Sequence, residues 1–179
     1  MTATLIGISG RARSGKDSVG AYLQTAHGFE RYAFAGPIKA GIRAMFGLDG
    51  RHTDGDLKEC ALASLGGKSP RQLMQTLGTE WGREHVAPSI WVDLGLDYWY
   101  GLQPEGRSLA ITDVRFENEA HAIRRAGGVV LHIVRPEAVA VAAHSSEAAL
   151  RVQSGDFAVF NNGTLAELFQ QVEGVLDYV

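Results

Sequence analysis

Hydrophobic residues follow two periods along this chain of 179 residues. Short apolar, β-branched runs alternate with segments in which apolar residues recur every three to four positions; the runs predict buried strands and the recurrence predicts helices. The predicted strands are residues 4–9, 29–34, 108–113, 129–135 and 157–160. Because strands and helices alternate throughout, the sequence predicts an α/β fold in which a parallel sheet carries helices on both faces.

Capping residues and apolar spacing predict where the helices lie. Ser69 followed by Pro70 is an N-cap followed by proline, and Thr164 with Glu167 has the spacing of a capping box. The stretch 47–67 has the weakest pattern, and only a short helix at 57–65 is expected there. The other expected helices are residues 18–26, 71–78, 89–100, 118–126 and 165–176, with one more that begins at Pro37.

The helical spacing also predicts which apolar side chains are buried. Trp91, Leu94 and Tyr98 are spaced as one buried stripe. Cys60 is expected to be buried as a small hydrophobic residue, and His132, inside a predicted strand, as a core histidine with satisfied hydrogen bonds. The apolar face of the helix that begins at Pro37 would consist of Ile38, Ile42, Met45 and Phe46.

The strongest chemical signal lies between the first predicted strand and the first predicted helix. Gly10, Gly15 and Lys16 form the pattern G-x-x-x-x-G-K with the flanking strand and helix that a phosphate-binding P-loop requires. Backbone N–H groups of such a turn and the positive end of the following helix point into one concavity. A polyphosphate fits there, with Lys16 on its β- and γ-phosphates.

The residue after this lysine departs from the common P-loop pattern. Most P-loops place a Ser or Thr hydroxyl there as a ligand of Mg²⁺, whereas this chain has Asp17 and a hydroxyl only at Ser18. The Asp17 carboxylate would either hold the metal through water or cap the helix. Arg11 and Arg13 add positive charge to the loop.

Polar residues elsewhere indicate a second group of ligand contacts. Asp113 ends a predicted strand and Arg115 follows it, which places a metal-binding or proton-accepting group and a phosphate clamp on one loop. Arg71 and Gln75 lie one helical turn apart, so both can address the same ligand. Lys39 lies in the first turn of its helix.

Composition limits the class of protein. With 45% hydrophobic and 21% charged residues, residues 1–179 are expected to form a single globular domain. A net charge of −3 argues against a dedicated nucleic-acid binder, because duplex binding rests on clustered cations. The single cysteine excludes an internal disulfide, and no apolar run approaches the length of a membrane span, so a soluble protein of the reducing cytoplasm is expected.

Residues 136–155 combine small and polar residues with little pattern. This segment is a candidate lid over the site, with Arg135, His144 and Arg151 as its candidate contacts.

Motifs along nearly the whole chain resemble those of the deoxynucleoside monophosphate kinases typified by the enzyme of T-even bacteriophages. They are S-G-K-D at 14–17, A-G-P-I-K at 35–39, R-x-L-M-Q at 71–75, L-G-T at 77–79, I-W-V at 90–92, D-x-R at 113–115, H-I-V-R-P at 132–136, H-x-x-E at 144–147 and N-G-T-L-x-E-L at 162–168. An Asp directly after the P-loop lysine is part of the family pattern. The stretch between Lys39 and Arg71 is much shorter here than in the T-even enzyme, so base preference is not carried over.

The resemblance implies a three-layer P-loop kinase fold, a homodimer and a role in deoxynucleotide biosynthesis, in the host cytoplasm if the chain is encoded by a bacteriophage. It implies transfer of the γ-phosphoryl group of ATP or dATP, with Mg²⁺, to the 5′-phosphate of a deoxynucleoside monophosphate. Donor contacts would come from Arg11, Arg13, Gly15, Lys16, Asp17 and Ser18, and Mg²⁺ contacts from Asp17 and Asp113. Acceptor contacts would come from Lys39, Arg71, Gln75, Gly78, Trp91, Asp113, Arg115 and Glu119. The groups that act on the transferred phosphoryl would be Lys16, Arg13, Asp113 and Arg115.

Two other classes of function stay open. A P-loop kinase with another acceptor, such as a nucleoside, a coenzyme precursor or a modified base in DNA, would keep the donor loop but need fewer arginines for an acceptor phosphate. A nucleotide-binding module without catalysis would also keep the loop. The pair of Arg71 and Arg115 argues against such a module.

Overall fold

The computed structural model describes residues 3–136 and 150–179. Most of the predicted lid, including His144, therefore lies outside the described residues. The chain forms two compact units, one made of Met1–Ala33 with Leu94–Val179 and the other of Phe34–Asp93.

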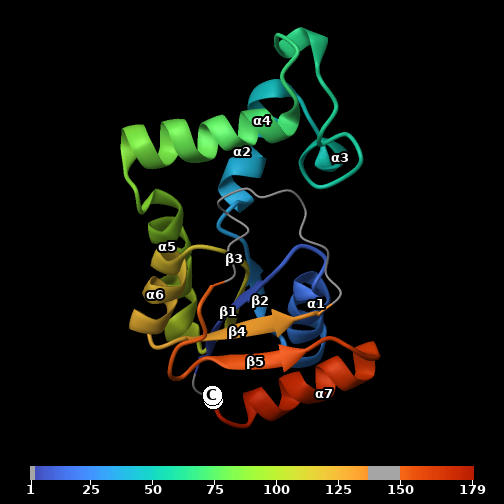
Figure 1. Ribbon diagram of the computed structural model, residues 1–179. Coiled ribbons are helices and arrows are strands. Elements are labelled where there is room, and N and C mark those ends of the chain that lie inside the picture. Colours follow the sequence, from blue (N-terminus) through green and yellow to red (C-terminus); the bar gives the residue numbers. More distant parts are fainter. Residues whose placement is uncertain (1–2, 137–149) are drawn as a thin grey trace. The chain divides into compact units, whose positions relative to one another are not determined.

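The first unit is built on one five-stranded parallel sheet (Figure 1). Its strands are β1 (Leu5–Gly10), β2 (Glu30–Tyr32), β3 (Leu109–Val114), β4 (Val129–Val134) and β5 (Phe157–Phe160), in the spatial order β2-β3-β1-β4-β5. Every neighbouring pair in this order is parallel. The predicted parallel α/β sheet is confirmed, and all carboxyl ends of its strands meet at one edge.

Helices cover both faces of this sheet. On one face, α1 (Lys16–His27) and α7 (Leu165–Leu176) pack against Ile6 and Ile8 of β1. The intervening Gly7 faces the other side, where a Cβ atom would lie 2.5 Å from Ile123 of α6 (Glu117–Arg125). The helix α5 (Ile90–Leu102) and a short helix that follows it, η3 (Gln103–Glu105), precede β3. The period of two along β1 thus separates the two helical layers.

Local signals account for the ends of the main helices. Gly28 ends α1 in the left-handed region, with a φ of 68°, which a residue with a side chain rarely adopts. The predicted capping box of α7 is confirmed, because the Thr164 side chain accepts from the Glu167 N–H and the Glu167 carboxylate accepts from the Thr164 N–H. Each cap provides hydrogen-bond partners for backbone groups at the helix end that have none within the helix.

The second unit is helical. It contains α2 (Gly36–Phe46), α3 (Gly50–Thr53), η1 (Ala63–Leu65), α4 (Pro70–Gln75), a π-helical segment η2 (Thr76–Val86) and the first turn of α5. Ser69 caps α4 and Pro70 is its first residue, as predicted. The chain continues from α4 into η2 without leaving helical conformation, so the predicted end at residue 78 was too early.

The prediction of a helix at 57–65 was wrong. Residues 56–59 form turns, and the short helix η1 lies within a loop closed by a bridge between Leu62 and Lys68. Gly66 and Gly67 have φ values of 63° and 75°, and this left-handed pair reverses the chain. Cys60 is exposed rather than buried, because the turn carries it away from any core.

Two predicted apolar stripes were partly wrong. Leu94 and Tyr98 are 42% and 39% exposed, whereas Trp91, Trp99 and Leu102 are buried. The buried stripe of α5 therefore runs at intervals of four, four and three residues through Trp91, buried Gly95, Trp99 and Leu102. On α2, Ile38 and Ile42 are buried but Met45 and Phe46 are exposed, since they lie in the last turn beyond the packed part of the helix.

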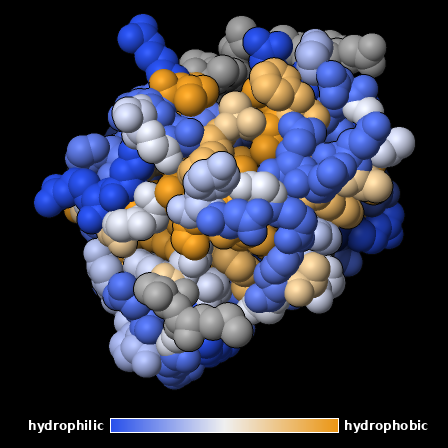
Figure 2. Space-filling model, turned by 90° about the horizontal axis from the view of Figure 1, so that it is seen from below, coloured by the Kyte–Doolittle hydropathy of each residue, from blue (hydrophilic) through white to orange (hydrophobic). Residues whose placement is uncertain are grey.

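Not every large apolar side chain is in the core. Figure 2 shows apolar surface between hydrophilic side chains on one face of the molecule. The exposed large residues of the first unit include Phe160, Leu165 and Tyr178. Within the described residues, no helix has both the length and the apolar composition needed to cross a membrane.

Candidate functional site

The loop from Gly10 to Gly15 joins β1 to α1, as the G-x-x-x-x-G-K pattern predicts. Ser14 N donates to Arg11 O at 3.2 Å, and Arg13 has a left-handed φ of 60°. Gly15 has a φ of 107°. A Cβ at Gly10 would lie 2.6 Å from Ser14 Oγ and 2.7 Å from a backbone oxygen of β4, so only glycine fits there.

Lys16 is the first residue of α1, and its side chain turns back over the loop. Its Nζ donates to the carbonyls of Gly10 and Arg11, both at 2.7 Å. Gly15 caps the helix without a side chain, so the positive end of α1 faces the loop. A helix N-terminus together with an ammonium group favours an anion, and a phosphate is the anion that this arrangement suits.

The loop lies at the switch point of the sheet. The chain leaves β1 into α1 on one face and leaves the neighbouring β3 into α6 on the other face. The two connections therefore diverge above the strand ends, which is where ligands bind in open α/β sheets. A pocket of about 390 Å³ lies at this edge. Its lining consists of residues 9–12, Lys16, Val114, Arg115, residues 132–136, Leu150 and Val152.

Predicted residues of the donor loop and of the β3 loop thus come together. Arg11, Lys16 and Arg115 line one pocket, as does Arg135 of the proposed lid contacts, whereas exposed Arg13 and Asp17 are not among the lining residues. Asp113 lies in β3 next to its end and is half-buried. Burial raises the pKa of the Tyr32 hydroxyl, and the negative charge of Asp113 raises it further.

Glu119 is buried beneath the Arg115 loop. It is 2% exposed, and its Oε2 accepts from Arg115 N at 2.8 Å and from Phe116 N at 3.1 Å. This is the hydrogen bonding of a residue at the third position of a helix toward the cap. The ligand contact of Glu119 stays a prediction; the contacts that the structure shows are structural, and they fix the backbone that carries Arg115.

Behind the pocket lies an ion-pair network that the sequence did not indicate. Asp156 accepts from Arg124 Nε at 2.9 Å and Nη2 at 2.8 Å, and from His132 Nε2 at 3.0 Å. Burial favours a high pKa for Asp156, but the hydrogen bonds from Arg124, the Gln153 N–H and His132 outweigh it and lower the pKa. His132 is buried and hydrogen-bonded, as predicted, and it also lines the pocket.

The same network holds residues 151–156, the segment that leads into β5, against α6. Arg151 N donates to Glu117 Oε1 at 3.2 Å, and Gln153 N donates to Asp156 Oδ2 at 2.8 Å. Leu150 and Val152, which alternate with these residues, line the pocket. Arg151 itself is therefore not among the residues that line the pocket, although both of its neighbours are. Its backbone N–H is bound to Glu117 of α6 instead.

Asn161 is a further residue that sequence reasoning missed. It directly follows β5, and its Nδ2 donates to the Ser14 carbonyl of the P-loop at 2.8 Å. It also lines a second pocket of about 140 Å³ with Arg135, Pro136, Asn162 and Gly163. Its position as the first polar residue after a predicted parallel strand was the available signal.

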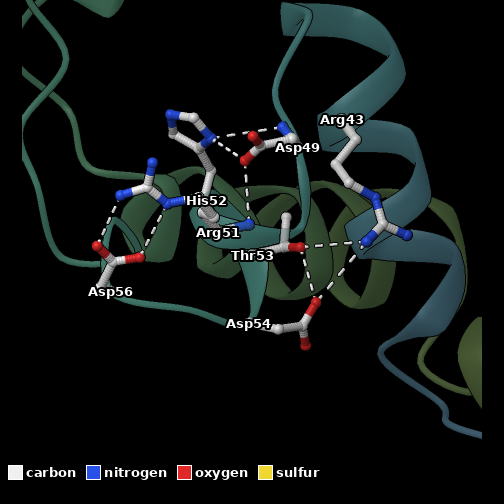
Figure 3. Close-up of polar contacts among 7 residues, drawn as sticks. All are labelled: Arg43, Asp49, Arg51, His52, Thr53, Asp54 and Asp56. Carbon is white, nitrogen blue, oxygen red and sulfur yellow. Dashed lines mark hydrogen bonds and ion pairs between the residues drawn. The ribbon is translucent and has the colours of Figure 1, made fainter.

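In the second unit, Lys39 belongs to a polar cluster on α2 and α3. Lys39 Nζ lies 2.5 Å from Asp54 Oδ1, and Arg43 lies 3.7 Å from the other carboxylate oxygen. Figure 3 shows Arg43 and Thr53 converging on Asp54. Burial favours a high pKa for Asp54, but the hydrogen bonds from Lys39 and Thr53 lower it below its ordinary value.

The short helix α3 presents Asp54 to these cations. Asp49 and His52 form a reciprocal capping box at its start, and Arg51 forms a two-pronged ion pair with Asp56 beyond its end (Figure 3). Thr53 is fully buried. A helix of one turn needs such tertiary and capping contacts, because it cannot be stable alone.

The remaining predicted residues of this unit lie on α4, η2 and α5. Arg71 and Gln75 are both exposed, as expected for one polar face, and Arg71 forms an ion pair with Glu59. Trp91 and Gly78 come together, because the indole Nε1 donates to the Gly78 carbonyl at 2.7 Å. The ring also packs on Gly82, where a Cβ would lie 2.5 Å from it.

The donor set for a metal is sparse. Among residues 3–136 and 150–179, no three or more His, Cys, Asp or Glu side chains are grouped so as to hold a metal ion. Two carboxylates lie close to the P-loop in the chain or in the sheet: Asp17 is in the first turn of α1, and Asp113 is next to the carboxyl end of β3. One or two carboxylates completed by phosphate oxygens and water are the usual surroundings of Mg²⁺ in kinase sites, and these residues fit that pattern.

Comparison with known proteins gives a consistent result over nearly the whole chain. The family model described as deoxynucleotide monophosphate kinase matches residues 4–68 and 51–172. A protein of Acanthamoeba polyphaga mimivirus named putative deoxynucleotide monophosphate kinase is 31% identical, over 97% of this chain and 96% of its own length. The deoxynucleotide monophosphate kinase of Enterobacteria phage T4 is 26% identical, over 96% of this chain and 98% of its own.

Solved structures match the fold at low identity. TT1252 from Thermus thermophilus has a TM-score of 0.55 and 18% identity, over 100% of this chain and 99% of its own. The APS kinase CysC of Mycobacterium tuberculosis has a TM-score of 0.50 and 13% identity, over 98% of each chain. These likenesses identify an α/β kinase fold.

Proposed function

Because this chain belongs to the deoxynucleotide monophosphate kinase family, we propose that it transfers the γ-phosphoryl group of ATP or dATP to the 5′-phosphate of a deoxynucleoside monophosphate. The products are the deoxynucleoside diphosphate and ADP or dADP. The observation that carries this function is the P-loop with Lys16 at the switch-point pocket. Such a transfer requires positioning and charge neutralisation more than a strong nucleophile.

The donor would be held in the first unit. Its phosphates would lie on the loop amides and the positive end of α1, with contacts from Arg11, Gly15 and Ser18. Lys16 would leave the carbonyls of Gly10 and Arg11 for the β- and γ-phosphates, and Arg13 would neutralise charge on the moving phosphoryl group. Asp17 and Asp113 would hold Mg²⁺, which supplies charge neutralisation for the bound phosphates.

The acceptor would be recognised by cations and by a few polar groups. Guanidinium and ammonium groups match a phosphate that carries nearly two negative charges, and Arg71, Arg115 and Lys39 would supply them. Lys39 would exchange Asp54 for the acceptor phosphate. The nucleoside would contact the remaining predicted residues, Gln75, Gly78, Trp91, Asp113 and Glu119.

A coupled spectrophotometric assay tests the proposed function. The purified protein is offered ATP or dATP with each deoxynucleoside and ribonucleoside monophosphate, and ADP formation is followed. We expect turnover with at least one deoxynucleoside monophosphate and none with the matching nucleosides. Turnover with nucleosides alone would identify a kinase of another acceptor, and ATP binding without any turnover would identify a binding module.

Two finer properties belong to the same proposal. The family resemblance supports a homodimer, which light scattering coupled to size-exclusion chromatography measures directly. Nucleotide substrates and a single, exposed cysteine are in keeping with the cytoplasm, that of a host cell if the chain is encoded by a bacteriophage.

A further inference from the structure

The loop after β5 reaches the P-loop through one buried side chain. Asn161 is 8% exposed, and its Nδ2 donates to the Ser14 carbonyl at 2.8 Å. Its backbone is fixed as well, because Asn161 N donates to Val134 O at 2.8 Å and so extends the pairing of β5 with β4. The side-chain amide therefore projects from a rigid base onto the P-loop.

Asn161 and Gly15 are matched in shape. A Cβ at Gly15 would lie 2.6 Å from Asn161 Nδ2, so the amide occupies the space that any larger residue at this position needs. Gly15 also has a φ of 107°, in the region that favours glycine. The close approach of the amide to the loop therefore depends on the same glycine that the P-loop pattern requires.

The bonded carbonyl determines where the next N–H group points. A trans peptide group directs its C=O and its N–H to opposite sides, so a Ser14 carbonyl held toward Asn161 turns the Gly15 N–H away from Asn161. Rotation of this peptide group requires a change of φ at Gly15, and glycine allows that change at little cost. A rotated group would present a carbonyl oxygen, not an N–H, to an anion on the loop.

We propose that Asn161 is a positioning residue that locks the Ser14–Gly15 peptide group in the orientation that binds the donor phosphates. This proposal rests on the proposed function for the identity of the donor. It assigns to the loop after β5 a role in the geometry of the P-loop, which acts on phosphate binding without contact with the transferred group.

Direct binding measurements separate this role from general stability. Calorimetry with ATP, ADP and AMP is carried out on the wild type and on Asn161→Ala, Asn161→Ser and the control Gln170→Ala, which removes an exposed amide of α7. We expect ATP and ADP to bind about tenfold more weakly to Asn161→Ala, while AMP, which lacks the β-phosphate, changes by less than about twofold. Asn161→Ser should lie between, and Gln170→Ala should match the wild type.

Equal losses for ATP, ADP and AMP, or unchanged ADP binding in a folded Asn161→Ala protein, would overturn the proposal. A measurement on the wild type covers the case in which the variants do not fold. The side-chain amide protons of Asn161, followed by NMR, should be protected from exchange with and without ADP, and rapid exchange in both states would also overturn it. Binding does not require turnover, so a protein that binds ADP as expected but leaves deoxynucleoside monophosphates unchanged would refute the proposed function alone.

Discussion

Replacement of Asp156 by Asn should destabilise the first unit strongly. The carboxylate is 1% exposed and accepts four hydrogen bonds, two from Arg124 at 2.9 and 2.8 Å, one from Gln153 N at 2.8 Å and one from His132 at 3.0 Å. Asparagine keeps the volume but has one acceptor oxygen, so an NH₂ group would face the donors of Arg124. The Arg124 side chain, only 16% exposed, would keep only the half-exposed Glu117 carboxylate, 3.8 Å away, as a counter-charge.

The magnitude follows from the burial of this pair. Removal of one partner of a buried ion pair costs about 3–5 kcal/mol when the other charge is left buried without compensation, and the remaining, more distant Glu117 carboxylate places Asp156→Asn at the lower end of this range. Whole domains have free energies of unfolding of about 5–15 kcal/mol, so the loss should be a large part of the total. Urea unfolding at pH 7, followed by circular dichroism, measures it. Asp177→Asn, at an exposed position, is the control and should stay within about 0.5 kcal/mol of the wild type.

The difference in stability between the wild type and Asp156→Asn should also depend on pH, in a direction that the structure predicts. Burial opposes ionisation of Asp156, but the hydrogen bonds from Arg124, Gln153 and His132 lower its pKa in the folded state. A group with a lowered folded pKa stabilises the protein above its unfolded pKa of about 3.9 and loses that contribution as the pH falls through the folded value. The difference in stability between wild type and Asp156→Asn should therefore shrink below about pH 4. A cost under about 1 kcal/mol at pH 7, or a difference that grows on acidification, would refute the reasoning.

Three further predictions test the proposed function. Lys16→Ala should lower kcat by about 10²-fold or more with folding retained, because the barrier loses several kcal/mol of charge neutralisation, and near-normal turnover would exclude the P-loop assignment. Asp17→Asn and Asp113→Asn should each raise the Mg²⁺ concentration needed for half-maximal activity, and unchanged titrations in both would make these carboxylates structural. Arg71→Lys and Arg115→Lys should each raise the KM for the deoxynucleoside monophosphate or lower kcat by about tenfold, roughly 1.4 kcal/mol, with ATP binding little changed. Loss of ATP binding with unaltered acceptor kinetics would move these arginines to the donor side.

The tertiary structure corrected expectations where local pattern is weak. In α5 several apolar residues are close in sequence, so the spacing permits more than one buried stripe. Trp91 is buried as predicted, but packing selected Trp99 and Leu102 instead of Leu94 and Tyr98. Cys60 was expected to be buried from its residue type alone, but the turn around it carries no core contact. Residue type and helical period do not determine which side of a short segment packs against the rest of the protein.

The sequence by itself determined the strand segments, the P-loop and the helix starts at Ser69 and Thr164, because these depend on neighbours within a few positions. Buried β-branched runs, the spacing of Gly10, Gly15 and Lys16, and caps such as Ser69 and Thr164 act locally. Only the tertiary structure brought Asn161 to the Ser14 carbonyl, 147 positions away, and Asp156 to Arg124, 32 positions away. Asn161 follows β5 and Ser14 follows β1, two strands that have β4 between them in the sheet, and Asp156 reaches Arg124 at the end of α6. Contacts between segments so far apart in the chain leave no local pattern in the sequence.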